Sequence, residues 1–192
     1  MLNPKFFQNL KAQHDLYNGE RQEIIQKSNE AIHKAKEAIF SFHRDDLKGG
    51  NQLIKEVEAT FADLEKNFQK DDSLRAEGSY RAAIEEYVEA KSFGRILQGE
   101  KIDAIEEVEK IDYESYVGGI CDVTGELVRK ATLYVIDGKI KEAEKLAEAL
   151  REIMTELIKF SLTSYLRTKY DQAKGGLRKM EEIMYDIKMR CK

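Results

Sequence analysis

The sequence predicts an all-α protein: a single-domain bundle of about six or seven largely antiparallel helices. The 192 residues include one proline and 12 glycines, which leaves little turn chemistry for a multi-stranded sheet, and long stretches are dominated by Glu, Lys, Ala, Leu and Ile. Apolar residues also recur at helical spacing between segments that resemble helix ends. No repeat or linker interrupts this pattern, so we expect residues 1–192 to form one domain.

The N-terminal half of the chain contains three of the expected helices. The first covers about residues 4–45, where apolar and small residues keep a helical period until HRDDLKGG. The second covers about residues 51–70 and ends where KDDSLRAEG breaks the period. The third contains EEYVEAKSF and ends near LQGEK.

Three further helices are expected after the short segment IDAIEEVEK. The first of them covers about residues 112–136 and ends at IDGK. The next, about 139–160, keeps isoleucine, leucine and alanine in register, and the last covers about 163–190. Helices of this length with short connections indicate a largely antiparallel arrangement.

Charge and hydropathy exclude several classes of protein. The net charge of -4, from 32 Lys and Arg against 36 Asp and Glu, argues against a chain that coats duplex DNA by bulk electrostatics. No apolar run approaches the roughly 18 residues of a membrane span, and the opening MLNPKFFQNLKAQ is too charged for a signal peptide. We therefore expect a cytoplasmic protein without a membrane partner. Cys121 and Cys191 lack metal-like spacing and are expected to be reduced.

Two carboxylates stand where the third helix should be apolar. At about 100° per residue, Glu86 and Glu89 share a side with Ala83, Ala90 and Phe93. An unpaired buried carboxylate is costly, so a protein neutralises it, pairs it with a cation or gives it a metal.

A second acidic pair lies in YVGGICDVTGELVRKA. Asp122 and Glu126 are four residues apart, so they lie within about 40° of each other and could hold one cation from one helix face. The main apolar arc of this helix lies away from both, however. The pair therefore also fits a solvated face on which Glu126 supports Lys130 at helical spacing.

Basic residues near these acids and in the last helix are candidates for nucleic-acid binding. The last helix mixes basic residues with tyrosines, which backbone neutralisation and base stacking require. Its alternative is a solvated face with ion pairs along the helix. The candidates are Arg81, Arg129, Arg167, Lys169, Lys174 and Arg178.

The stretch EYVEAKSF, followed by DYESYVGGICDVTGELVR, resembles the translin and Trax family, specifically its Trax branch. SNEAIHKAKEAIFSFHR and LRTKYDQAKGGLRKMEEIMYDIKMR resemble the first and last long helices of that family. The resemblance implies an all-helical bundle whose subunits assemble into a closed homo-oligomer around RNA, with an octamer as one form. The chain lacks the long insertion of Trax between the two acidic motifs.

In the Trax branch four acidic residues supply an endoribonuclease activity, and the matching positions here are Glu86, Glu89, Asp122 and Glu126. Four carboxylates from two helices, without His or Cys, suit Mg²⁺ or Mn²⁺. We therefore expect metal-dependent cleavage of single-stranded RNA, with the same four residues as metal ligands and catalytic residues. The general base is left open between Glu89 and Glu126.

Two other classes of function remain open from the sequence. A translin-like oligomer could hold single-stranded RNA or DNA without cutting it, although this leaves the acids unexplained. A ferritin-like di-iron protein would use Glu-x-x-His twice. Glu30 and His33 supply one copy only, because neither His14 nor His43 has a glutamate three residues before it. His33 is therefore interpreted as a surface or packing residue.

Overall fold

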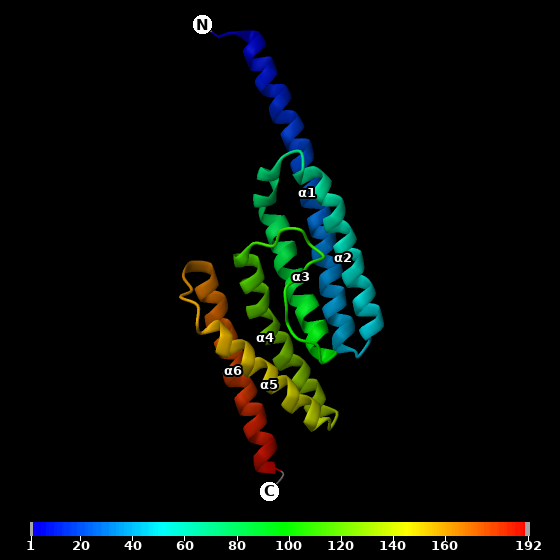
Figure 1. Cartoon of the computed structure of the whole chain (residues 1–192), viewed down its shortest axis with the longest axis vertical. Helices are drawn as coiled ribbons and strands as arrows, with labels where there is room; N and C mark the ends of the chain where they lie inside the picture. The colour runs from blue at the N-terminus through cyan, green and yellow to red at the C-terminus, as the bar shows by residue number, and fades with distance from the viewer. Residues whose placement is uncertain (1, 191–192) are drawn as a thin grey trace.

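The computed structural model describes residues 2–190 of the chain, which excludes Cys191. These residues contain six α-helices, one short 3-10 helix and no β-strand, which confirms the all-α prediction (Figure 1). The elements are α1 (Pro4–His43), α2 (Leu47–Phe68), η1 (Asp72–Ala76), α3 (Gly78–Leu97), α4 (Tyr113–Ile136), α5 (Ile140–Leu157) and α6 (Ser164–Arg190).

The helix bounds follow the sequence prediction closely except at the start of α2. The prediction placed HRDDLKGG between two helices, but α2 begins inside it, at Leu47. The reason is a cap: the Asp46 side chain accepts a hydrogen bond of 2.8 Å from the backbone nitrogen of Gly49. Gly50 then lies directly against the Phe42 ring, where a side chain would collide. Both glycines therefore belong to the first turn of α2, and Gly50 allows this turn to pack against the end of α1.

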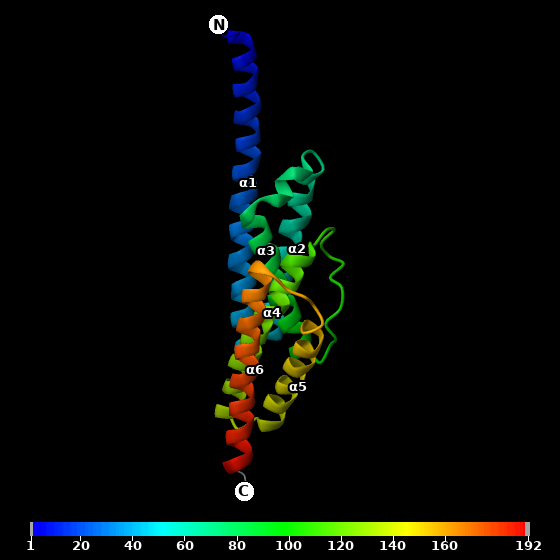
Figure 2. The ribbon, with the colours of Figure 1, turned by 90° about the vertical axis from the view of Figure 1, so that its left-hand side faces the viewer.

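The bundle consists of two three-helix halves, α1–α2–α3 and α4–α5–α6, which meet along α3 and α4 (Figures 1 and 2). Most helices that follow one another in sequence are antiparallel. The exception is the pair α3 and α4, because the segment 98–112 carries the chain back along the bundle before α4 begins. The buried side chains of Ile105 and Val108 hold this segment against the bundle. As a result α3 and α4 run in the same direction, side by side.

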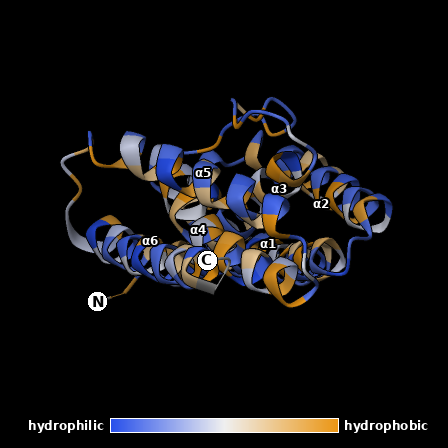
Figure 3. Ribbon diagram, turned by 90° about the horizontal axis from the view of Figure 1, so that it is seen from below, coloured by the Kyte–Doolittle hydropathy of each residue, from blue (hydrophilic) through white to orange (hydrophobic). Residues whose placement is uncertain are grey.

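Seen from below, the helices carry polar and apolar residues side by side (Figure 3). The side chains of Phe42, Tyr87, Phe93, Leu127 and Leu150 are completely buried and belong to one connected apolar core. Burial of apolar surface of this kind is the main source of stability in a helical bundle.

Two adjacent glycines bring α3 and α4 together. A Cβ atom at Gly119 would lie 2.6 Å from the carbonyl oxygen of Glu85 and 2.8 Å from the Cβ of Val88. A Cβ atom at Gly118 would lie 2.1 Å from Oε2 of the Glu85 side chain. Only glycine allows the two helices to approach this closely at that point. The YVGGI segment therefore sets the spacing of the seam on which both acidic motifs lie.

The first half of α1 extends beyond the rest of the bundle (Figures 1 and 2). Residues 2–17 are all exposed, and Ile24 is the first completely buried residue of the helix. Among residues 2–190, no helix combines the length and apolar character needed to cross a membrane.

Candidate functional site

Both acidic motifs lie on the seam between α3 and α4. Glu86 and Glu89 are near the middle of α3, and Asp122 and Glu126 are near the middle of α4. Because both pairs lie near the middle of helices that pack side by side, they lie along the same stretch of the seam. Glu86, Glu89 and Glu126 border the same cleft, and Asp122 is near enough for its charge to act on Glu89, so the four acids predicted from the sequence lie around one stretch of the seam.

Glu89 is the most buried of the four acids, with 8% of its surface exposed. Burial raises the pKa of Glu89 to about 9, and the neighbouring charges of Glu86, Asp122 and Glu126 add to the effect. Within residues 2–190 no basic side chain forms a hydrogen bond or ion pair with this carboxyl group. Glu89 is therefore neutral at pH 7 unless a cation reaches it.

Lysines from other helices contact two of the remaining acids. Lys36 of α1 lies 3.7 Å from Glu86, where burial raises the pKa of the carboxyl group and Lys36 opposes the shift. Lys169 of α6 binds Asp122 and also contacts Glu85 at 2.7 Å. Burial alone would lower the pKa of Lys169, but its hydrogen bonds with these two acids raise it. Burial raises the pKa of Asp122 as well, against the effect of Lys169.

Glu126 contacts a histidine and an arginine. The ring nitrogen Nε2 of His43, the last residue of α1, hydrogen-bonds to Oε2 of Glu126. Arg129 lies 3.6 Å from the same oxygen. The predicted pair between Glu126 and Lys130 is absent, because Lys130 points into the protein and binds the end of α1 instead.

The seam opens to solvent through a cleft of about 350 Å³ between α1, α3 and α4. Three of the four acids line it, together with two basic side chains and two apolar ones. The lining residues are Lys36, Ile39, Phe40, Glu86, Glu89, Glu126 and Arg129. A phosphate backbone in this cleft would therefore meet both carboxylates and cations.

The donor chemistry of the seam fits a hard divalent cation, since carboxylate oxygens are the ligands that Mg²⁺ and Mn²⁺ prefer. Burial raises the pKa of Glu89 and repulsion from the other acids adds to the shift, and a bound cation would relieve that repulsion. As the side chains stand, however, residues 2–190 contain no group of three or more His, Cys, Asp or Glu positioned to hold a metal ion. To gather around one ion, the acids would have to turn away from Lys36 and Lys169.

The six predicted nucleic-acid ligands lie in different places. Arg129 lines the cleft and Lys169 binds the acids, so only these two reach the seam. Arg81 pairs with Asp112 and Glu114 at the start of α4. Arg167 pairs with an aspartate of its own helix at 3.0 Å. Lys174 and Arg178 are exposed on α6 and form no ion pair within the described residues.

The positions of Glu30 and His33 argue against a di-iron centre. The His33 side chain is 76% exposed and pairs with Glu37 of its own helix, while Glu30 accepts a hydrogen bond from Gln26. A di-iron bundle directs its Glu-x-x-His motif inward. His33 is a surface residue, as predicted.

Four residues of the site were not predicted from the sequence: Lys36, Phe40, His43 and Lys130. The first three follow one side of α1 at intervals of four and three residues, which is a helical spacing. That signal could have grouped them on one face. Nothing in the sequence indicates that this face meets α4, more than 80 residues later.

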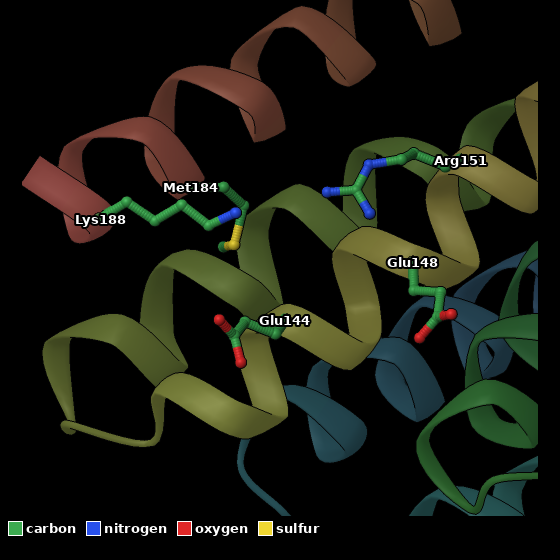
Figure 4. A pocket seen from close by; sticks show the side chains of 5 residues that line it. All are labelled: Glu144, Glu148, Arg151, Met184 and Lys188. Atoms are coloured by element: carbon green, nitrogen blue, oxygen red, sulfur yellow. The ribbon is translucent and has the colours of Figure 1, made fainter.

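A second hollow, of about 270 Å³, lies between α5 and α6. Glu144, Glu148 and Arg151 of α5 and Met184 and Lys188 of α6 line it (Figure 4). Its charges are of both signs, and it contains none of the predicted site residues.

The fold and the site thus define a class: an all-helical protein whose two halves meet at a buried acidic seam beside a mixed-charge cleft. Comparison with known proteins is more specific. A profile of the Translin family matches residues 19–191, and the chain belongs to that family. This confirms the resemblance found in the sequence.

Among curated relatives, the Translin-associated protein X homolog of Schizosaccharomyces pombe is 27% identical over 191 residues, which cover 88% of this chain and 81% of the relative. An uncharacterised protein of Methanocaldococcus jannaschii is 28% identical over 166 residues, covering 83% of this chain and 72% of the relative.

Solved structures share the fold of this chain. The apo form of NeC3PO is similar with a TM-score of 0.84 and 25% identity, over 96% of this chain and 98% of that one. AfC3PO in complex with duplex RNA has a TM-score of 0.83 and 22% identity, over 96% and 97% of the two chains.

Proposed function

We propose that this protein is a Trax-like endoribonuclease that depends on Mg²⁺ or Mn²⁺ and cleaves single-stranded RNA at the seam between α3 and α4. The observation that carries the proposal is Glu89: a buried carboxyl group without a basic partner in residues 2–190, surrounded by three other acids and open to a cleft. Strongly shifted acids in a cleft are typical of functional sites.

The four acids are proposed as metal ligands and catalytic residues. A bound divalent cation would activate a water molecule and stabilise the charge that develops on the phosphodiester. Glu126 is the better candidate for the general base, because the raised pKa of Glu89 leaves that group protonated at pH 7 until a cation displaces the proton. Arg129 and Lys36, at the same cleft, would hold the phosphate backbone.

RNA as the substrate is supported by the family and by the similar structure of AfC3PO in complex with duplex RNA. Single-stranded RNA is the narrower proposal, and the matched test uses the same labelled sequence with and without its complement.

We also propose a homo-oligomer, since the extended part of α1 exposes Phe6, Phe7 and Leu10, and partners commonly cover such apolar surface. Light scattering during gel filtration would show whether it contains eight subunits.

The test is cleavage of a labelled RNA oligonucleotide in Mg²⁺, in Mn²⁺ and in chelator, with wild type beside Glu89→Ala. The proposal expects cleavage only with a metal ion and loss of cleavage, but not of RNA binding, in the variant. Glu30→Ala, at an exposed position of α1, is the matched control. Cleavage that survives replacement of all four acids would refute the proposal.

A non-catalytic single-stranded RNA- or DNA-binding oligomer is the second candidate. It is favoured by one observation: Lys36, Lys169 and His43 already neutralise or bind three of the acids. In that case wild type binds the oligonucleotide and leaves it intact in every metal ion.

A further inference from the structure

His43 differs from the other two histidines of the chain in its burial. The side chains of His14 and His33 are 69% and 76% exposed, whereas that of His43 is 3% exposed. His43 ends α1, and its ring packs against Phe93 of α3 with the ring centroids 4.9 Å apart. A buried polar ring needs hydrogen-bond partners, and within the described residues only Nε2 has one, since Nδ1 is buried without a partner.

The partner of Nε2 is Glu126, and only one of the two carboxylate oxygens of Glu126 takes part in the contact. Nε2 of His43 faces Oε2 of Glu126, so Nε2 is the donor, because a carboxylate only accepts. Arg129 approaches this same oxygen. Oε1 of Glu126 forms no hydrogen bond or ion pair within the described residues, although Glu126 lines the cleft. The histidine thus holds one oxygen and leaves the other available.

Lys130 fixes the main chain that carries His43. This lysine is completely buried, and its ammonium group donates hydrogen bonds of 3.0 Å to the carbonyl oxygens of Phe42 and His43. It also contacts Asp45 at 2.6 Å. Lys130 lies four residues after Glu126, on the same side of α4. The two side chains therefore bind the end of α1 at two points, one through its backbone and the other through the imidazole.

We propose that His43 is a positioning residue, which holds Glu126 through Nε2 so that its free oxygen faces the cleft, on a backbone anchored by Lys130. The inference rests on the proposed function, in which Glu126 binds the metal ion. Removing a hydrogen-bonding partner of a metal ligand typically costs 10- to 100-fold in metal affinity or activity.

Two isosteric variants test the position of the donor. The amide nitrogen of glutamine reaches about as far as Nε2 of histidine, while that of asparagine reaches only about as far as Nδ1. His43→Gln should retain Mn²⁺ affinity and kcat within about threefold of wild type, whereas His43→Asn should weaken Mn²⁺ binding and lower kcat by about 10- to 100-fold, with the KM for RNA unchanged. Mn²⁺ binding is measured by electron paramagnetic resonance without RNA, and His33→Asn is the control on the same helix.

A purely structural role would make the glutamine and asparagine variants alike, and that result would overturn the inference. Circular dichroism shows whether either variant is unfolded. If His43→Asn is unfolded, His43→Gln is compared with wild type and with His43→Ser instead. His43→Ser is then expected to weaken Mn²⁺ binding and lower kcat as predicted for His43→Asn. A wild type that neither binds Mn²⁺ nor cleaves RNA overturns the proposed function and the positioning role together. A wild type that does both, beside an asparagine variant with the same constants, overturns the positioning role alone.

Discussion

Replacement of Glu89 by glutamine should stabilise the protein, and the gain should grow with pH. Burial and the neighbouring acids raise the pKa of Glu89 from 4.5 to about 9 in the folded chain. The folded state therefore keeps a proton that the unfolded chain releases. The stability contributed by this proton is fully present below pH 4.5 and is lost as the pH rises through about 9. Glutamine carries no such proton and escapes this loss.

The size of the effect follows from the shift. Between the two pKa values, stability falls by at most about 1.4 kcal/mol per pH unit. Neutral pH lies about 2.5 units above the ordinary pKa of 4.5, so the ceiling at pH 7 is about 3 kcal/mol. Because Glu89 borders a solvent-filled cleft, we expect about 1–3 kcal/mol.

The assay is urea unfolding followed by circular dichroism, from about pH 5 to about pH 8, for wild type and Glu89→Gln. Glu30→Gln, on the exposed side of α1, controls for the loss of one carboxylate. The free energies of wild type and variant should nearly coincide at the acid end and diverge steadily above it. A difference that stays constant across the range, or a wild type that is more stable than the variant at pH 8, would refute the electrostatic account of Glu89.

Three further outcomes are expected. Gly119→Ala should lower the free energy of unfolding by about 1–3 kcal/mol in urea titrations, since its Cβ would collide with α3, whereas Gly125→Ala, with nothing within 4 Å, should leave it unchanged or raise it. Lys130→Met should cost about 1–3 kcal/mol in the same assay, because it leaves the carbonyl oxygen of His43 without a donor and the carbonyl oxygen of Phe42 with only a backbone donor; an unchanged midpoint would contradict this. If Lys174 and Arg178 contact RNA phosphates, replacing both by alanine should reduce the slope of log affinity against log salt by about 1.4, and an unchanged slope would exclude them from the interface.

The helices of this bundle could be predicted from the sequence because the signal for them is local. Apolar residues repeat with the helical period inside each segment, and the expected bounds lie within a few residues of those observed. The start of α2 was predicted wrongly because two local signals contradict each other there. The glycine pair indicates a break between helices, whereas Asp46 caps the start of a helix. Contact with Phe42, which only the folded structure shows, decides between them.

The site could be predicted only in part. The helical period correctly placed Glu89 on the buried side of α3. The helical period did not decide whether Asp122 and Glu126 are buried or solvated. It indicates a single apolar side for each helix, whereas α4 is covered by three helices: α3, α5 and α6. Their side chains are 27% and 23% exposed, which is less than a solvated face would give. The contact of His43 with Glu126 joins residues 83 apart, and no local pattern encodes it.

The contrast between Glu89 and its neighbours bears on why the seam is acidic at all. The bundle relieves the repulsion at Glu86, Asp122 and Glu126 with Lys36, Lys169 and His43, so it has the means to neutralise a carboxyl group at this depth. Within the described residues no lysine, arginine or histidine pairs with Glu89 in this way, although a neutral glutamine would fill the same space. Retaining an acid where it destabilises the fold is expected when the group is needed as a ligand or in a reaction. The stability gained by Glu89→Gln and the activity lost by it should therefore come from the same carboxyl group, and a variant that gains stability while still cleaving RNA would separate the two.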